Sequence, residues 1–135
     1  MGAAAAGSAE AGVVTKVSPR SVADTVARLR DLLAAKGMTV FAVIDQAAEA
    51  RRVGLQLRDT VLVLFGSPEA GTPVMDASPL VAVDLPLKVL VWDHDGETEV
   101  SYTAPGTLAS RYRLDPDLAA RLAGIEPLTD ALCAP

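Results

Sequence analysis

Residues 87–104 read LKVLVWDHDGETEVSYTA, and this stretch decides the fold that we expect. Two apolar runs flank Asp95-Gly96. An Asp-Gly pair between such runs is the strongest short signal of a β-hairpin, because a type I′ turn needs positive φ at both central residues. With these two residues as the loop, His94 faces Glu97 and the register of both strands is set.

The two strands of this hairpin carry apolar residues on both faces. One face carries the residues that we expect in the core, which are Val89, Val91, Val100 and Tyr102. The other face carries Leu90 and Trp92, which a sheet covered on one side would leave open. Large exposed apolar patches mark partner or ligand surfaces, so Leu90 and Trp92 are expected to form a dimer interface or to line a pocket.

Working outward from the hairpin, the sequence predicts further strands and helices. Strands are expected at 13–17, 38–45, 60–65, 87–93 and 97–104, a long helix between Ser21 and Gly37, a short one at 47–53, and helical pieces after Thr107, one of them with Asp115 as N-cap. The strands at 38–45 and 60–65 are apolar on both faces. The order predicts a two-layer α+β domain, with long helices on one side of an antiparallel sheet.

The composition indicates one compact domain. The chain has 135 residues, of which 50% are hydrophobic and 21% charged, and about 100–150 residues is a usual domain size. We expect a disordered tail over residues 1–12 and a single domain over 13–135. A lone cysteine excludes a disulfide scaffold, and the longest run without a charged residue, 100–110, is too short to span a bilayer.

Charge and the N-terminal composition limit the partners and the compartment. The formal net charge is -5 and there is no run of Lys and Arg, which argues against nucleic-acid or anionic-membrane partners. The start, MGAAAAGSAEAG, lacks the basic and strongly apolar segments of a signal peptide. We therefore expect a cytoplasmic protein.

The segment 66–72, GSPEAGT, has the Gly-x4-Gly spacing of a phosphate-binding loop. The lysine of that motif is absent, Pro68 removes an amide donor, and Glu69 would repel a phosphate. We therefore predict a strand-to-helix loop in which Thr72 is the helix N-cap and Pro73 is the first helical residue. The two glycines would allow a ligand to approach the backbone closely.

Other residues that could carry chemistry are few. The segment 93–97 gathers carboxylates around the only histidine, but it coincides with the tight turn and lacks calcium-loop spacing, so no metal or cofactor is expected. Cys133 is interpreted as an apolar filler or an exposed thiol. Asp84 and Lys88 bracket Leu85-Pro86-Leu87 and are interpreted first as a turn-stabilising pair and second as ligand contacts.

Several strings resemble one protein family. They are GMTVF at 37–41, IDQAA at 44–48, LFGSPEAGTPVM at 64–75 and DLPLKVLV at 84–91. Together they resemble the family called domain of unknown function 302, from about Val13 into the C-terminal helices. The resemblance implies a topology similar to that of the TATA-binding protein, strand-helix-four strands-helix, and it implies homodimers. It implies neither DNA binding nor a settled activity.

Two positions depart from the family pattern. Gln46 stands where the family usually has His, and Ser67 stands where it usually has Asn before Pro. A neutral amide cannot act as a general base or bind a metal as imidazole does. The departure therefore argues against a catalytic or metal-binding role at Gln46.

The leading hypothesis is a homodimeric module that binds a small apolar or amphipathic ligand between the sheet and the segment 66–85. The residues expected to bind it are Gln46, Gly66, Gly71, Thr72, Asp84 and Lys88. No catalytic residue is assigned. Two alternatives stay open: a small enzyme that uses Asp84 or Asp45 as acid or base, and a structural protein whose apolar face docks onto another chain.

Overall fold

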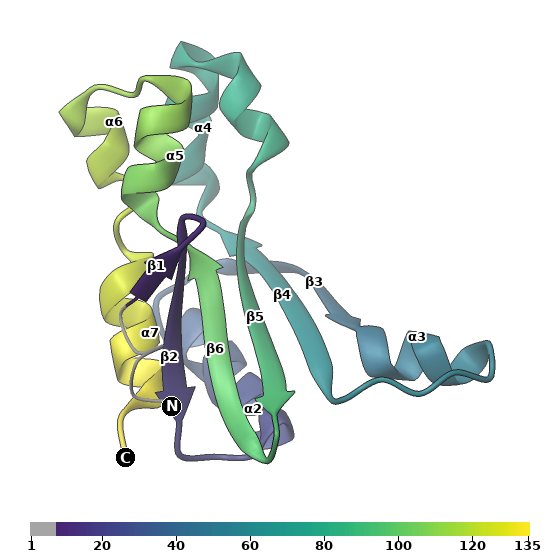
Figure 1. Ribbon diagram of the computed structural model, residues 1–135. Coiled ribbons are helices and arrows are strands. Elements are labelled where there is room, and N and C mark those ends of the chain that lie inside the picture. Colours follow the sequence, from purple (N-terminus) through teal and green to yellow (C-terminus); the bar gives the residue numbers. More distant parts are fainter. Residues whose placement is uncertain (1–7) are drawn as a thin grey trace.

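The computed structural model describes residues 8–135, and its centre is a six-stranded antiparallel sheet with the order β1-β2-β6-β5-β4-β3 (Figure 1). The elements in chain order are β1 (Ser8–Glu10), β2 (Val13–Ser18), α2 (Val22–Ala35), β3 (Thr39–Asp45), α3 (Gln46–Arg52), β4 (Thr60–Gly66), α4 (Pro68–Ala77), η1 (Pro79–Val83), β5 (Leu87–His94), β6 (Glu97–Thr103), α5 (Pro105–Tyr112), α6 (Pro116–Ala120) and α7 (Ile125–Cys133). The predicted α+β class is confirmed. From β2 onward, the sheet and the two helices that cover it follow the expected order of strand, helix, four strands and helix.

The hairpin that decides the fold forms as predicted. Asp95 and Gly96 both adopt positive φ, at 53° and 92°, and His94 lies opposite Glu97. The Asp93 carboxylate accepts a hydrogen bond from the Gly96 amide at 3.0 Å. This contact reinforces the turn, so the pairing of β5 with β6 is fixed from its tip.

The long helix α2 also begins and ends where the sequence places its signals. The Ser21 hydroxyl accepts a hydrogen bond from the Asp24 amide at 3.0 Å, which satisfies one of the unpaired donors of the first turn. Gly37 follows the helix with φ 68°, a conformation that glycine adopts without strain. Between these ends, Leu29 and Leu33 are completely buried against the sheet.

The main core lies between α2, α7 and one face of the sheet. Alternate residues of β4 and β5 point into it, and four of them are fully buried: Val63, Phe65, Val89 and Val91. Both residues that β6 was expected to add, Val100 and Tyr102, are buried as well. The predicted core face of the hairpin is therefore confirmed.

Polar side chains hold α7 in place on this core. Lys16 of β2 donates hydrogen bonds to Thr129 at 2.7 Å and to Asp130 at 2.8 Å. Arg20 and Arg28 donate to backbone carbonyls in the last turn of α7 at 3.0 and 2.9 Å. Cations are favourable at this end of a helix, because the last carbonyls carry the negative end of its dipole.

A second lobe extends beyond the end of the sheet (Figure 1). It contains α4, η1, α5 and α6 around a small core of its own, made of Val74, Val81, Leu108 and Leu122. The sequence predicted helices after the 66–72 loop and again after Thr107, but it did not predict that these helices pack together. Leu87, at the start of β5, contacts both cores.

The expectation of a disordered tail is wrong for part of its range. Residues 1–7 lie outside the described residues, but Ser8–Glu10 forms β1, with Ala9 opposite Val14 of β2. Ala11 and Gly12 both have positive φ and make a tight turn. The edge of β2 offers unpaired backbone groups, and β1 pairs with them. The composition of this segment carries no signal for a strand.

The predicted start of the helix after β4 is also wrong. It begins at Pro68 rather than Pro73, with Ser67 as N-cap, whose hydroxyl accepts from the Ala70 amide at 3.3 Å. Thr72 and Pro73 lie inside this helix. Ser67-Pro68 is the same cap-and-proline signal as Thr72-Pro73 and comes first after the strand, so the chain turns there.

None of the helices within residues 8–135 combines the length and the apolar character needed to cross a lipid bilayer.

Replacing Leu29 by alanine should lower the free energy of unfolding by about 2–5 kcal/mol, because it leaves a cavity in the centre of the main core. Urea denaturation at a fixed chain concentration measures the change. Leu80→Ala is the matched control, since Leu80 is 72% exposed and its truncation should cost within about 0.5 kcal/mol. Equal losses in the two variants would contradict this description of the core.

Candidate functional site

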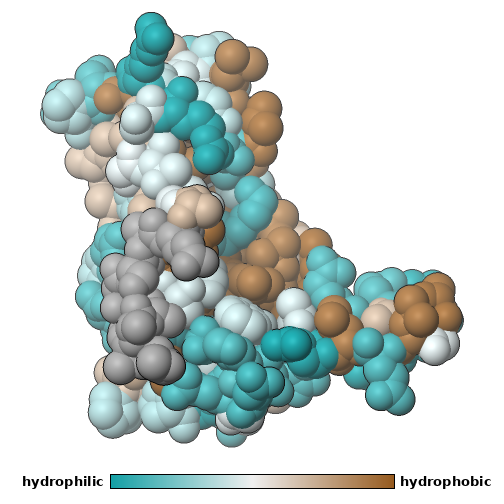
Figure 2. All heavy atoms as spheres, viewed as in Figure 1, coloured by the Kyte–Doolittle hydropathy of each residue, from teal (hydrophilic) through white to brown (hydrophobic). Residues whose placement is uncertain are grey.

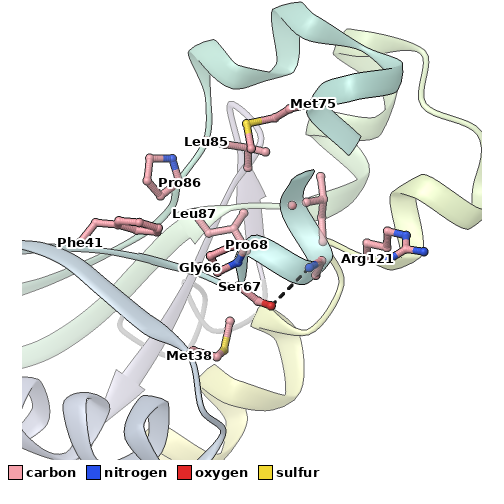
Figure 3. A pocket seen from close by; sticks show the side chains of 13 residues that line it. Met38, Phe41, Gly66, Ser67, Pro68, Met75, Leu85, Pro86, Leu87 and Arg121 are labelled. Carbon is pink, nitrogen blue, oxygen red and sulfur yellow. Dashed lines mark hydrogen bonds between the residues drawn. The ribbon is translucent and has the colours of Figure 1, made fainter. Parts of the chain in front are cut away.

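A pocket opens where the end of the sheet meets the second lobe (Figure 3). It encloses about 160 Å³, and its walls are almost entirely apolar. Met38 and Phe41 contribute from the sheet side, and Met75 and Leu85 from the lobe. The pocket therefore lies between the two cores of the molecule.

An irregularity in β3 brings Phe41 to the rim of this pocket. The pairing of β3 with β4 shifts register between Val40 and Ala42, which leaves Phe41 as the extra residue of a β-bulge. Bulges re-aim a side chain out of the regular alternation. The ring passes over Gly66, where a Cβ atom would lie 3.4 Å from Phe41 Cε2. The ring of Phe41 and the backbone of Gly66 are therefore close neighbours at the rim.

The first turn of α4 forms another wall. Ser67 caps the helix, and Ala70 and Gly71 line the pocket (Figure 3). A Cβ atom at Gly71 would meet only Met75 Cε, at 3.8 Å, which is an ordinary contact. Gly71 is therefore not required by close packing, and its missing side chain leaves space in the pocket.

Arg121 is the charged residue of the lining (Figure 3). It follows α6, its side chain is exposed, and it makes no ion pair with another residue between 8 and 135. Arginine side chains commonly line an apolar wall with the aliphatic stem while the guanidinium stays in water. A cation thus stands at the edge of an apolar pocket.

The structure brings together only some of the six predicted ligand-binding residues. Gly66 and Gly71 line the pocket, while Thr72 is exposed on α4 and is absent from the lining. Gln46 lies at the far end of the sheet. β3 runs for seven residues from Thr39, the partner of Gly66, to Asp45, the neighbour of Gln46, and this length corresponds to about 20 Å.

Asp84 and Lys88 lie beside a neighbouring hollow and stabilise the segment that leads into β5. Lys88 Nζ donates to the backbone carbonyls of Asp84 at 3.2 Å and Pro86 at 2.9 Å. The Asp84 carboxylate instead accepts from Tyr112 and from Arg111, the latter at 2.7 Å. Both side chains hold this turn, but they do not pair with each other.

The hydrogen bond from Tyr112 and the ion pair with Arg111 lower the pKa of Asp84 below its ordinary value. The hydrogen bond to the Asp84 carboxylate in turn raises the pKa of the Tyr112 hydroxyl. Asp84 therefore stays ionised near neutral pH and binds two side chains of α5. These contacts fasten the end of η1 to α5.

The second apolar region is the face of the sheet that points away from α2 and α7, which we call the open face. Its apolar side chains come from three adjacent strands, where Leu62 of β4 lies between Ile44 of β3 and Leu90 of β5. Leu64 and Trp92 extend it along the strands. Figure 2 shows apolar surface gathered on this side of the molecule, between the second lobe and α3.

Trp92 is fixed in place on the open face by polar neighbours. Its indole Nε1 donates to the Ser101 hydroxyl at 3.0 Å, and its ring stacks on His94 with centroids 5.0 Å apart. His94 Nδ1 lies 3.1 Å from a carboxylate oxygen of Glu99, which is buried. These contacts hold the Trp92 ring in one orientation at the edge of the open face.

Comparison with known proteins identifies the family. A family model described as domain of unknown function DUF302 matches residues 14–132. The chain belongs to the DUF302 family. A crystal structure of an uncharacterized conserved DUF302 protein from Bacillus stearothermophilus has the same fold, with a TM-score of 0.78 at 23% sequence identity over 92% of this chain and 97% of that one.

Two curated relatives of this DUF302 chain come from Brucella and are named fluoride-specific ion channel FluC 1. The protein of Brucella suis is 37% identical over 106 residues, which are 78% of this chain and 42% of that protein. The protein of Brucella abortus has the same identity over the same length, with 39% of it covered. The chain spans about two fifths of the length of these relatives.

Sequence reasoning missed several residues that line the DUF302 pocket. Met38 and Met75 are far apart in the chain and have no polar signal, and Arg121 lies in a helical segment with ordinary charge spacing. The Gly-rich string around Gly66 was the one local clue to this place. Cys133, expected as a filler or exposed thiol, packs against the main core, and burial raises the pKa of its thiol.

Replacing Asp84 by asparagine should change how the stability of this DUF302 domain depends on pH. Because the folded pKa of Asp84 is lowered, its ionised form stabilises the fold above the unfolded pKa, and this contribution is lost as pH falls through the folded pKa. The wild type should lose melting temperature more steeply than Asp84→Asn from about pH 5 downward, and the variant should melt lower at pH 7. Asp76→Asn, on an exposed position of α4, is the control, and identical pH profiles for the two variants would refute the assignment.

Proposed function

We propose that this DUF302 domain binds a small amphipathic molecule in the pocket between the sheet and the second lobe. The size and apolar lining of the pocket carry this proposal. An apolar cavity of about 150 Å³ accommodates one benzene molecule, so a pocket of about 160 Å³ suits one aromatic ring or a short alkyl chain. The two methionines give the walls an adaptable, polarizable surface.

The charge at the edge of the pocket favours an anionic head group. Arg121 is the charged residue of the lining, and its guanidinium is directed away from the pocket in Figure 3. A rotation of this exposed side chain would bring it to the mouth, and guanidinium groups bind carboxylates through paired hydrogen bonds. The ligand class that fits both features is a small carboxylic acid with an apolar body, such as hexanoate or benzoate. Its tail would lie between Met38 and Met75, with its carboxylate at the mouth.

Thermal denaturation with hexanoate and benzoate tests this function. A ligand at one hundred times its Kd should stabilise the wild type by about 2.7 kcal/mol, seen as a higher melting temperature. Gly71→Leu should abolish the rise, because the new side chain occupies the pocket. Gly106→Leu is the matched control on α5, where a Cβ atom meets nothing within 4 Å, and it should respond like the wild type.

The head group is tested with the corresponding neutral alcohols and with Arg121→Gln. The wild type should respond more strongly to the acids than to hexanol and benzyl alcohol, and Arg121→Gln should lose this preference. If no probe raises the melting temperature of the wild type, or if Gly71→Leu responds as strongly as Gly106→Leu, the pocket is not the binding site.

The open face favours a second function, self-association. We propose that the domain is a homodimer that covers Leu62, Leu90 and Trp92 of each copy. An apolar surface over three strands costs free energy when it contacts water, and a two-fold axis covers both copies with one interface. We also propose, from the sequence alone, that the dimer is cytoplasmic and that its partners include neither nucleic acid nor anionic membrane.

Replacing Leu90 by glutamate should convert the dimer to a monomer, because it would place a charge inside the apolar interface. Native mass spectrometry at one protein concentration gives the two populations. Leu80→Glu is the matched control, since Leu80 is exposed on η1 in the second lobe, and it should remain dimeric. A Leu90→Glu protein that stays dimeric would show that the interface lies elsewhere.

The alternative of a small enzyme that uses Asp84 or Asp45 gains no support from the contacts of these carboxylates. Asp84 is paired with Arg111 and Tyr112, and Asp45 caps α3 by accepting from the Ala48 amide at 2.9 Å. The channel function named for the Brucella relatives is not carried over, because the chain matches only 42% and 39% of their lengths.

A further inference from the structure

One segment of the chain leaves the body of the domain with apolar side chains in water. Helix α3 and the residues that follow it project from the end of the sheet (Figure 1), and we call residues 46–59 the arm. Every residue from 51 to 59 is exposed. Among them, Val53, Leu55 and Leu57 are 73%, 64% and 46% exposed. Three large apolar side chains on one protruding segment indicate a surface that another chain covers.

The arm also carries positive charge without a local partner. Arg52 pairs with Glu49 on the same helix at 2.6 Å. Arg51 and Arg58 make no ion pair within residues 8–135. At the tip of the β5–β6 hairpin, Asp95 and Glu97 are both exposed. The arm and the hairpin tip are thus of opposite charge.

The arm and the hairpin tip lie at the same end of the sheet. Thr60, where the arm ends, is opposite Trp92, and the Asp93 amide donates to the Asp59 carbonyl at 2.9 Å. The arm starts from the β3 edge of the sheet, whereas the hairpin belongs to its interior. A two-fold axis parallel to the strands would keep this end in common and exchange the two edges. Each arm would then meet the hairpin end of the other copy.

We propose that the arm of each copy lies across the hairpin end of its partner when two open faces pack together. Leu55 and Leu57 contact the margin of the partner's apolar face, around Trp92 of the partner subunit. Arg51 and Arg58 pair with Asp95 of the partner subunit and Glu97 of the partner subunit. This inference rests on the homodimer proposed above. It adds that the arm covers the margin of the dimer interface and that charge pairs fix how the two copies are oriented.

Complementary charge reversal tests the inference. One variant carries Arg51→Glu and Arg58→Glu, and the other carries Asp95→Asn and Glu97→Lys, where asparagine is chosen because it tolerates the positive φ of residue 95. Each variant alone brings like charges together and should shift in native mass spectrometry from the mass of two chains towards that of one. In the mixture, both contacts are attractive, so a heterodimer should form.

The outcomes separate the arm from the dimer. If the wild type is a dimer and both variants remain as dimeric as the wild type, or if the mixture forms no heterodimer, the arm does not make this contact although self-association stands. A wild type that is monomeric at every concentration overturns both. Circular dichroism should stay unchanged in each variant, because all four positions are exposed, whereas the melting temperature should fall in a variant that loses its partner.

A paired serine substitution tests the apolar half of the contact. Leu55→Ser with Leu57→Ser should weaken the dimer, measured as a rise in the monomer fraction on dilution. Leu80→Ser with Val83→Ser is the matched control, since both residues are highly exposed but belong to the second lobe. Equal monomer fractions in the two double variants would overturn a role for the arm leucines.

Discussion

The packing of α2 and α7 against a single face of the sheet is the constraint on which the other features depend. Leu29 and Leu33 of α2 are fully buried on that face, with Val63 and Val89 of the central strands. Successive residues of a strand point to opposite faces. The neighbours of these valines, among them Leu62 and Leu90, therefore point away from both helices, and because they too are apolar they create the open face.

The same constraint determines where the pocket lies. The helices cover the sheet but not its end, where the chain leaves β4 to build the second lobe around a core of its own. Leu87 packs against both cores and so fixes the lobe relative to the sheet. The pocket is the space left at this junction, bounded by the bulged Phe41 on one side and the first turn of α4 on the other. Preformed, mostly apolar sites of this kind are where proteins hold small ligands.

Local signals predicted the elements well, and they failed where distant segments meet. Asp95-Gly96 and Ser21 determine a turn and a helix start through their own backbone and side-chain hydrogen bonds, so sequence was sufficient. Two cap-and-proline signals lie between 67 and 73, and the helix begins at the first of them, Ser67-Pro68, rather than at the predicted Thr72-Pro73. Gln46 and Gly71 are both expected to bind the ligand from the sequence, but the full length of β3 separates Gln46 from the pocket. Arg121 reaches the pocket only because the lobe folds back, which no local pattern encodes.

Methyl NMR of the methionines tests most directly whether a small acid binds in the space between the sheet and the lobe. Met38 lies on the sheet side of the pocket and Met75 on the lobe side (Figure 3). Titration with hexanoate should shift the methyl resonances of both residues with one common midpoint, because a single ligand contacts both walls. Unmoved resonances at saturating hexanoate, or a shift of only one of the two, would contradict the account.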